Sequence, residues 1–181
     1  MSEEKNYNPK DLFLSGTNTY LPSVSIDCVV FGFHNGIMKI LLNKLKSYKR
    51  MMLPGGFILI DEDVDSAAHR ILKERTGLGD IYLKQFHLFG DHNRTNIDEN
   101  RRVLHDCGID DEKAEWFLRR FVSVGYYAFA DYSQVQISTA SHEEIKWVNI
   151  DEIPDDLYSD HNIIINKALS TIRAQIGSVP I

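Results

Sequence analysis

The sequence predicts a single α/β domain, and two observations support that class. Runs rich in β-branched and aromatic residues, each long enough for a strand, recur along the chain and are separated by turn signals. Two other segments have the periodicity of amphipathic helices, one over residues 64–75 and one that opens at Asp160-His161. A chain of 181 residues is long enough to bury a substantial core in one domain.

The overall composition is that of an ordinary globular protein. Hydrophobic residues make up 43% of the chain and charged residues 25%, and a net charge of −6 argues against a purely electrostatic grip on nucleic acid. No apolar run reaches membrane-spanning length and the N-terminus is polar, so neither a membrane span nor a signal peptide is expected. Cys28 and Cys107 are too few for a disulfide framework, so a cytoplasmic location is predicted.

The first part of the chain is predicted to form a lead-in and a β-hairpin. Residues 1–22 are expected to be a polar segment that packs loosely on the body. Residues 23–33 and 37–45 then form two strands joined by a tight turn that contains an Asn-Gly pair. Asp27 is unusual within the apolar first strand. Either it lies on a solvated face or at a hydrogen-bonded strand end, or its carboxylate faces a ligand.

A glycine turn, an acidic loop and a helix follow in the stretch LPGGFILIDEDVDSAAHRILKERTGL, residues 53–78. Its two adjacent glycines permit positive φ and let a ligand approach the backbone closely. The acidic loop favours a helix start, with Asp63 or Asp65 as the N-cap. The helix is expected to end at residue 75, with Gly77 as its C-cap.

This stretch resembles the Nudix box, a pattern of one glycine, five residues, glutamate, seven residues, then Arg-Glu-apolar-any-Glu-Glu-any-Gly-apolar. The spacing fits throughout, and the Pro-Gly-Gly-Phe lead-in is also typical of the family. The matching positions are Gly56, Glu62, Arg70, Leu72, Glu74, Gly77 and Leu78. The resemblance implies a Nudix α/β/α sandwich with a central mixed sheet. A buried Arg70–Glu74 pair is expected to fix the loop to the helix.

Two positions depart from this pattern, and both belong to the metal site that the resemblance implies. Ile71 stands in place of the glutamate after the arginine, and Arg75 in place of the second glutamate of the Glu-Glu pair. In the family these glutamates hold a divalent cation that polarises a diphosphate and activates water. A hydrocarbon offers no oxygen ligand and an arginine repels a dication. We therefore expect no cofactor, with Glu74 at most a metal ligand, and Mg²⁺ or Mn²⁺ only if the domain is a hydrolase.

The rest of the chain extends the resemblance to nearly its whole length. A strand is expected over residues 81–90, a polar insert over 91–115 with a short helix at 98–106, and a central strand over 116–129. The last strand spans residues 144–149 and precedes the closing helix. In this order the chain is similar to Nudix-related bacterial transcriptional regulators of sugar or NAD metabolism. In those proteins a Nudix-like domain senses a small molecule and a winged helix binds DNA.

The predicted Nudix-like domain spans residues 23–177, and residues 178–181 are expected to begin a linker to a winged-helix domain beyond the chain. Each of two groups of basic residues has two possible interpretations. The cluster around Lys44 either meets phosphates or is a solvated charge run, and Arg94, with two further arginines of the insert, either caps an anionic ligand or a second subunit or is surface charge. The residues expected to bind the ligand are Gly55, Gly56, Arg70, Lys49, Arg50 and Arg120.

Three functions remain open from the sequence. The preferred one is a non-catalytic effector domain that binds a sugar or nucleotide-sugar-like metabolite, because the scaffold is retained while metal ligands are replaced. The second is a metal-dependent Nudix hydrolase of a nucleoside diphosphate derivative such as ADP-ribose, which would use Glu62, Glu74 and a carboxylate from elsewhere, such as Glu143 or Glu144. The third is a homodimer that mainly positions a DNA-binding partner.

Overall fold

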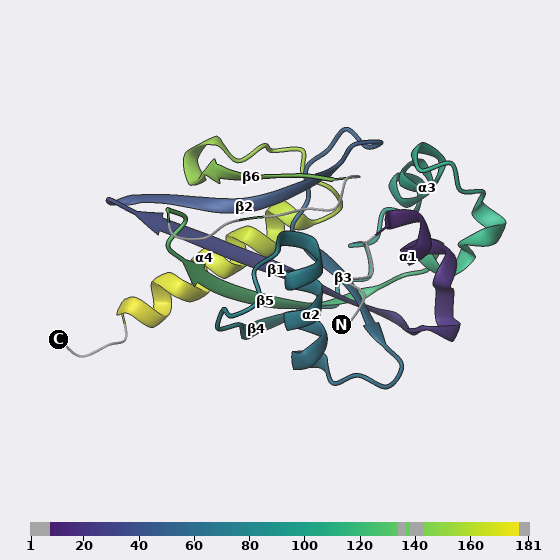
Figure 1. Cartoon of the computed structure of the whole chain (residues 1–181), viewed down its shortest axis with the longest axis horizontal. Coiled ribbons are helices and arrows are strands. Elements are labelled where there is room, and N and C mark those ends of the chain that lie inside the picture. Colours follow the sequence, from purple (N-terminus) through teal and green to yellow (C-terminus); the bar gives the residue numbers. More distant parts are fainter. Residues whose placement is uncertain (1–7, 134–136, 138–142, 178–181) are drawn as a thin grey trace, which may run out of the picture.

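A mixed sheet organises the chain within residues 8–133, 137 and 143–177, the parts that the computed structural model describes (Figure 1). Five strands follow the order β4-β5-β1-β2-β6, and a sixth, β3, pairs with β1 outside this path. The strands are β1 (Tyr20–His34), β2 (Ile37–Leu45), β3 (Gly55–Leu59), β4 (Lys84–Phe89), β5 (Val122–Ala130) and β6 (Glu143–Asn149). The helices are α1 (Pro9–Ser15), α2 (Val64–Thr76), α3 (Ile97–Asp106) and α4 (His161–Gly177), with short 3₁₀ turns η1 (Gly16–Asn18), η2 (Asp111–Lys113), η3 (Glu115–Leu118) and η4 (Ile150–Glu152).

Strand β1 is the centre of the sheet. It runs parallel to β5 along one edge, whereas its other edge pairs antiparallel first with β3 and then with β2. The change of partner lies between Asp27, which pairs with Gly55, and Phe31, which pairs with Ile40. A change of strand partner can leave buried backbone N–H and C=O groups without hydrogen bonds. At this split the N–H of Cys28 is satisfied, because it donates to the carbonyl of Pro54 at 2.8 Å.

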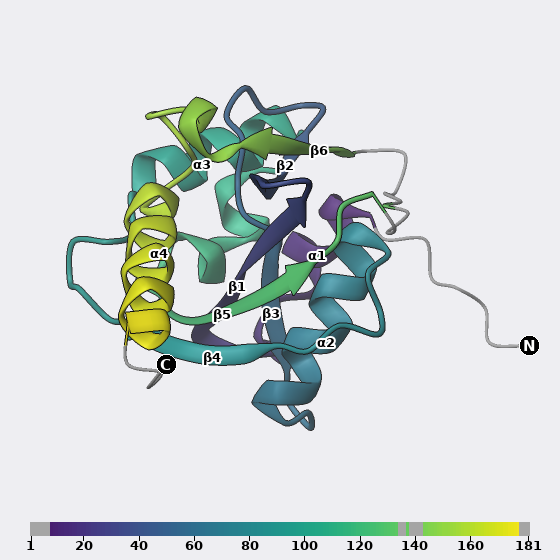
Figure 2. The same cartoon turned by 90° about the vertical axis from the view of Figure 1, so that its left-hand side faces the viewer.

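Helices cover both faces of the sheet, as Figure 2 shows with α4 on one side and α2 on the other. The face under α2 packs a cluster that includes Ile26, Ala68 and Leu72, while Phe31 and Ile164 belong to the cluster under α4. Because successive side chains of a strand point to opposite faces, neighbouring positions of β1 supply the two clusters alternately. The predicted α/β/α sandwich with a central mixed sheet is confirmed.

A third, aromatic cluster lies beyond the end of the sheet, under α1 and α3. Phe13 of α1 is only 5% exposed, and its carbonyl accepts a hydrogen bond from the indole N–H of Trp116 at 2.8 Å. The expectation of a loosely packed lead-in is therefore wrong for its described part, because α1 is docked and β1 already begins at Tyr20. Residues 1–7 and 178–181, including the expected linker, lie outside the described residues.

The predicted strand over residues 116–129 is wrong in its first third. Residues 115–118 form the turn η3, and β5 begins only at Val122. The apolar side chains of Trp116, Phe117 and Phe121 are buried in the aromatic cluster instead of the sheet. Strand β5 lies between β4 and β1, so the central position belongs to β1. Apolar content alone does not distinguish these two modes of burial.

The remaining elements follow the predictions with small shifts at their ends. The hairpin turn has left-handed φ values at Asn35 (48°) and Gly36 (76°), as an Asn-Gly turn requires. Helix α2 starts after Asp63 at the N-cap and ends at Gly77, whose φ of 78° is left-handed. Among the described residues, no helix has the length and apolar character needed to cross a bilayer.

Candidate functional site

One arginine of α2 holds the loop that connects β3 to α2. Arg70 donates from Nε and Nη2 to the two carboxylate oxygens of Glu62, at 2.8 and 2.7 Å. Its Nη2 also donates to the carbonyl of Phe57 at 2.9 Å, and its Nη1 donates to Glu74 at 3.0 Å. Glu62 in turn accepts the backbone N–H of Leu59 at 3.2 Å. The retained positions of the Nudix box therefore clamp the loop to the helix.

The clamp favours the ionised form of Glu62. Burial by itself would raise the pKa of Glu62, but the hydrogen bonds from Arg70 and Leu59 and the charge of Arg70 hold that pKa below its ordinary value. The expectation of a buried Arg70–Glu74 pair is wrong, because the Glu74 side chain is 42% exposed. The main partner of Arg70 is Glu62, whose side chain is 14% exposed.

Ile71 places hydrocarbon directly over the glycine turn. Its side chain is 2% exposed and belongs to the core cluster under α2. A Cβ atom at Gly56 would lie 3.1 to 3.3 Å from three carbon atoms of Ile71, which is closer than ordinary van der Waals contact. Gly56 therefore has a packing role here, because any side chain at this position would push against Ile71.

Arg75 forms a buried ion pair between helix α2 and strand β6. Its Nη2 lies 2.8 Å from Oε1 of Glu143 on β6, and the two side chains are 6% and 1% exposed. Asn43 of β2, which is fully buried, donates from its amide nitrogen both to Oε2 of Glu143 at 2.9 Å and to the carbonyl of Arg75 at 3.1 Å. A buried charge is tolerated only when it is paired in this way. The pair fastens the end of α2 to the strands β2 and β6.

The residues at the Nudix metal positions do not fit a magnesium or manganese ion. Such ions need several oxygen ligands in near-octahedral geometry, and the helix offers one carboxylate, Glu74, beside Ile71 and Arg75. Glu143, weighed as a substitute ligand, is paired with Arg75, and Glu62 is bound to Arg70. Among the described residues, no three His, Cys, Asp or Glu side chains are grouped so as to hold a metal ion.

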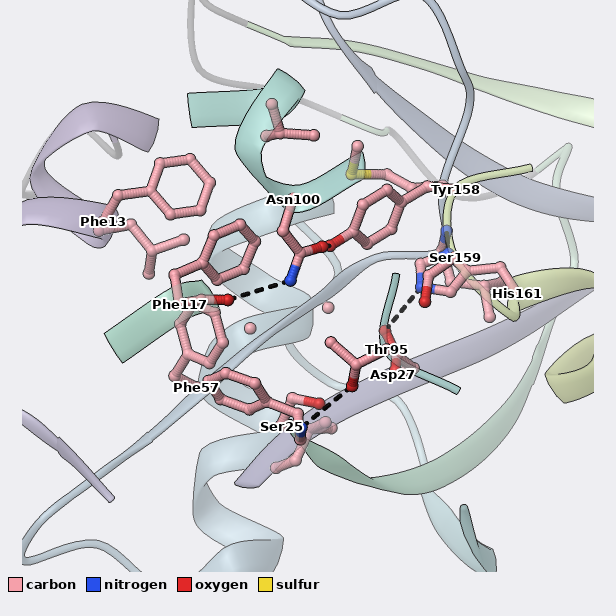
Figure 3. Close-up of a pocket in the computed structure, with 18 of the residues that line it drawn as sticks. Phe13, Ser25, Asp27, Phe57, Thr95, Asn100, Phe117, Tyr158, Ser159 and His161 are labelled. Atoms are coloured by element: carbon pink, nitrogen blue, oxygen red, sulfur yellow. Dashed lines mark hydrogen bonds and ion pairs between the residues drawn. The ribbon is translucent and has the colours of Figure 1, made fainter. Parts of the chain in front are cut away.

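A pocket of about 100 Å³ lies where the sheet splits, between β1, β3 and the aromatic cluster (Figure 3). One wall is aromatic: the rings of Phe57 and Phe121 have centroids 5.5 Å apart, and those of Phe13 and Phe117 lie 4.7 Å apart. The opposite side is polar, and Figure 3 shows its labelled side chains facing the aromatic wall. The polar lining residues are Ser25, Asp27, Arg75, Arg94, Thr95, Asn100, Tyr158, Ser159 and His161.

Asp27 is the carboxylate at the centre of the polar side. It is 7% exposed, accepts a hydrogen bond from the Ser123 hydroxyl at 2.5 Å and lies 3.3 Å from Nε2 of His161. Because Nδ1 of His161 accepts the backbone N–H of Leu53 at 2.8 Å, the ring proton of the neutral imidazole belongs on Nε2, which faces Asp27. Burial would raise the pKa of Asp27, but His161, Arg94 and Ser123 together hold it below its ordinary value.

Arg94 is a buried part of this pocket. It donates from Nε and Nη2 to both oxygens of Asp160, at 2.9 and 2.8 Å, and from Nη1 to the carbonyl of Phe121 at 3.1 Å. Its Nη2 is also 3.9 Å from Asp27, and the side chain is 6% exposed. The reading of Arg94 as surface charge is therefore wrong. This arginine joins the insert to the start of α4 through a bidentate pair.

Glu99 of α3 lies outside the pocket lining and joins the insert to two other segments of the chain. Glu99 is 2% exposed and accepts hydrogen bonds from the Tyr48 hydroxyl at 2.6 Å, from Arg50 at 2.7 Å and from the backbone N–H of Ser159 at 3.1 Å. Three separate segments thus meet at one carboxylate. A long insert in a domain is often functional, and this one forms part of the pocket wall.

The predicted ligand-binding residues divide into two groups. Gly55 and Gly56 line the pocket, and a side chain at Gly55 would collide with Asp27 Oδ1, which would lie 2.5 Å from the added Cβ. The other four lie outside the lining. Arg70 is turned toward the Glu62 loop, and Arg50 is bound to Glu99. No contact described here tests whether these residues bind a ligand, so their binding role stays a prediction.

Lys49 and Arg120 complete that second group. Lys49 borders a separate surface cleft together with Lys44 and Lys146. Arg120 is exposed and donates to the carbonyl of Gly90 at 2.5 Å. Both residues were expected to bind the ligand, but neither belongs to the lining of the pocket.

Most of the polar side of the pocket was not predicted. His161 was noted only as a helix start, while Asn100, Tyr158 and Ser159 carried no recognisable signal. Tyr158 donates to Asn100 at 2.5 Å, and Asn100 donates to the carbonyl of Phe117 at 3.0 Å. Two signals were available: Asp27, a carboxylate inside an apolar strand, since such a buried acid requires partners, and Arg94, weighed as a cap for an anionic ligand.

The sandwich, the split sheet and the clamped glycine loop together define a Nudix-type domain. The chain belongs to the NUDIX domain family, which matches residues 21–168. It is 25% identical over 182 residues to the ADPR responsive transcriptional repressor NtrR of Acinetobacter baylyi, an alignment that covers 96% of this chain. The chain spans 64% of the length of that repressor.

Two solved structures of a Shewanella oneidensis protein have the same fold. The NUDIX domain of Shewanella oneidensis NrtR complexed with ADP ribose matches with a TM-score of 0.62 and 23% identity, covering 95% of this chain and 99% of that one. NrtR of the same organism complexed with a 27mer DNA matches with a TM-score of 0.62 and 25% identity, covering 84% of this chain and 63% of that one. The predicted likeness to Nudix domains of transcriptional regulators is confirmed.

Proposed function

We propose that this domain is the non-catalytic effector-sensing part of a transcriptional regulator, with an ADP-ribose-like nucleotide sugar as its effector. The observation that carries the proposal is that the scaffold and the loop clamp are retained while the metal positions hold Ile71 and a buried Arg75–Glu143 pair. The relatives named for ADP-ribose response or ADP-ribose binding support this class of effector.

The lining of the pocket suits the sugar ring of such an effector. Sites that enclose a whole drug-sized ligand measure about 300–1,000 Å³, whereas a cavity of about 150 Å³ holds one benzene ring. A pocket of about 100 Å³ is therefore too small for the whole effector, and only a small part of it would lie inside. In this proposal the sugar packs a C–H face on Phe57 and Phe117, and its hydroxyls donate to the Asp27 carboxylate, as ribose hydroxyls do to acidic residues elsewhere.

DNA binding, in this proposal, is the task of a separate winged-helix domain. The net charge of −6 makes the 181 residues themselves a poor electrostatic match for phosphates. The effector would act by shifting the population of conformations that the regulator adopts, which requires a difference in affinity between those conformations.

The test is a binding screen on the chain with ADP-ribose, NAD and D-ribose, followed by thermal unfolding and calorimetric titration. A ligand that binds the folded state raises the free energy of unfolding by mass action, by about 2.7 kcal/mol at a concentration 100 times Kd, and the unfolding temperature rises with it. Asp27→Asn should weaken ADP-ribose binding by about tenfold, because one charged acceptor is lost. Glu112→Gln makes the same charge change at an exposed position and should leave binding unaltered.

The same samples separate a sensor from an enzyme. ADP-ribose incubated with the protein and Mg²⁺ should be recovered intact. Release of AMP that disappears in Glu74→Gln would establish the hydrolase instead, and the absence of any thermal shift with all three ligands would refute the effector proposal.

A further inference from the structure

The lining of the pocket includes two arginines but not the carboxylates that pair with them. Arg75 and Arg94 both line it, and Asp27 is the one carboxylate among the described lining residues. The carboxylates that pair with the two arginines, Glu143 and Asp160, are not in the lining. Two arginines that belong to buried ion pairs therefore line the pocket, while their acidic partners do not.

Arg75 is held by contacts to its side chain and to its backbone. The buried Asn43 amide binds both the carbonyl of Arg75 and the carboxylate of Glu143, so backbone and partner are fixed together. A guanidinium has five N–H donors in a planar fork and can bridge a carboxylate and a phosphate at once. Fixed donors of this kind cost little to reorganise when an anion arrives.

We propose that Arg75 replaces the divalent cation of the Nudix site and binds the phosphate of the effector directly, so that effector binding is independent of metal. The inference rests on the function proposed above. The ion that the Nudix box would hold on α2 is replaced by one covalently attached positive charge, at a position of the box where a metal ligand is expected. Its counterion, Glu143, keeps that charge stable inside the protein when no effector is bound.

The experiment is a calorimetric titration of the chain with ADP-ribose, in EDTA and in Mg²⁺. The expected Kd is the same within about twofold in both buffers, well below the tenfold change that 1.4 kcal/mol produces. Arg75→Gln alone would leave Glu143 buried and unpaired, so the diagnostic protein is Arg75→Gln/Glu143→Gln, which removes both charges. This double variant should bind ADP-ribose at least about tenfold more weakly, while the thermal shift with D-ribose, which has no phosphate, stays as in the wild type.

The outcomes are distinguishable from failure of the proposed function. If the wild type binds neither ADP-ribose nor D-ribose, the effector function itself is wrong. If the wild type binds ADP-ribose only with Mg²⁺, or if the double variant binds it as tightly as the wild type, the role of Arg75 is refuted. Should the double variant not fold, Arg75→Lys keeps the charge but not the planar fork, and unchanged ADP-ribose affinity in that variant would equally contradict direct phosphate recognition.

Discussion

The two sides of helix α2 differ in which parts of the Nudix box they retain. On one side, Arg70 keeps the contacts to Glu62 and Phe57 that shape the glycine loop. On the other, the positions that would hold metal carry Ile71, buried in the core, and Arg75, buried in an ion pair. Shape and chemistry of the Nudix box are therefore separable, because different residues of one helix are responsible for each.

The two departures from the Nudix box also affect the charge balance of the site differently. Ile71 alone would leave the remaining carboxylates near one another without a cation, at an electrostatic cost. With Arg75 present, the carboxylate of Glu143 has a protein partner at 2.8 Å. In this chain the carboxylate of Glu143 is balanced by a side chain of the protein and not by a metal ion.

The largest effect is expected from breaking the Arg75–Glu143 pair. Arg75→Gln should lower the free energy of unfolding by about 3–5 kcal/mol, since Glu143 is left as a buried unpaired charge. Arg75→Gln/Glu143→Gln should recover most of this loss. Urea unfolding of the three proteins measures the difference, and equal loss in the single and double variants would show that the pair is not the cause.

A smaller effect is expected from rebuilding the metal positions. Ile71→Glu/Arg75→Glu should create a divalent-cation site, so that Mn²⁺ at 100 times its Kd stabilises the variant by about 2.7 kcal/mol. The wild type should show no shift of its unfolding temperature with Mn²⁺. A thermal shift of the wild type, or none in a folded variant, would contradict the assignment of these two positions.

The retained side of the helix should contribute less. Arg70→Gln removes charge-assisted hydrogen bonds to Glu62 and should cost about 1.5–3 kcal/mol. Glu74→Gln, a change at the exposed end of the same cluster, should cost only about 0.3–0.5 kcal/mol. Similar losses in both variants would mean that the loop clamp is not centred on Glu62.

The pH dependence of the free energy of unfolding should isolate the contribution of the Arg70–Glu62 contact. Because the folded pKa of Glu62 lies below its ordinary value, Glu62 contributes stability above its unfolded pKa of about 4.3, and this is lost as the pH falls through the folded pKa. The stability gap between wild type and Glu62→Gln should therefore narrow below about pH 4.3. Thermal unfolding from pH 7 downward checks this, and a gap that widens on acidification would be the wrong sign.

Local signals predicted the fold far better than the pocket. The hairpin, α2 and its Gly77 cap follow from turn and capping chemistry, which depends on neighbouring residues. The segment 116–121 was misassigned because its apolar side chains are buried in an aromatic cluster whose other members, such as Phe13, lie about a hundred residues away in the sequence. The polar side of the pocket combines β1, the insert and the start of α4, and no local pattern contains that arrangement.

The most direct measurement is a titration of ADP-ribose into the protein in EDTA, with the ligand then recovered and identified. Binding without metal and recovery of intact ADP-ribose, also after Mg²⁺ is added, is the predicted result. The contradicting result is binding that appears only with Mg²⁺ and is followed by conversion of ADP-ribose to AMP and ribose phosphate. That result would identify the domain as a catalytic Nudix hydrolase.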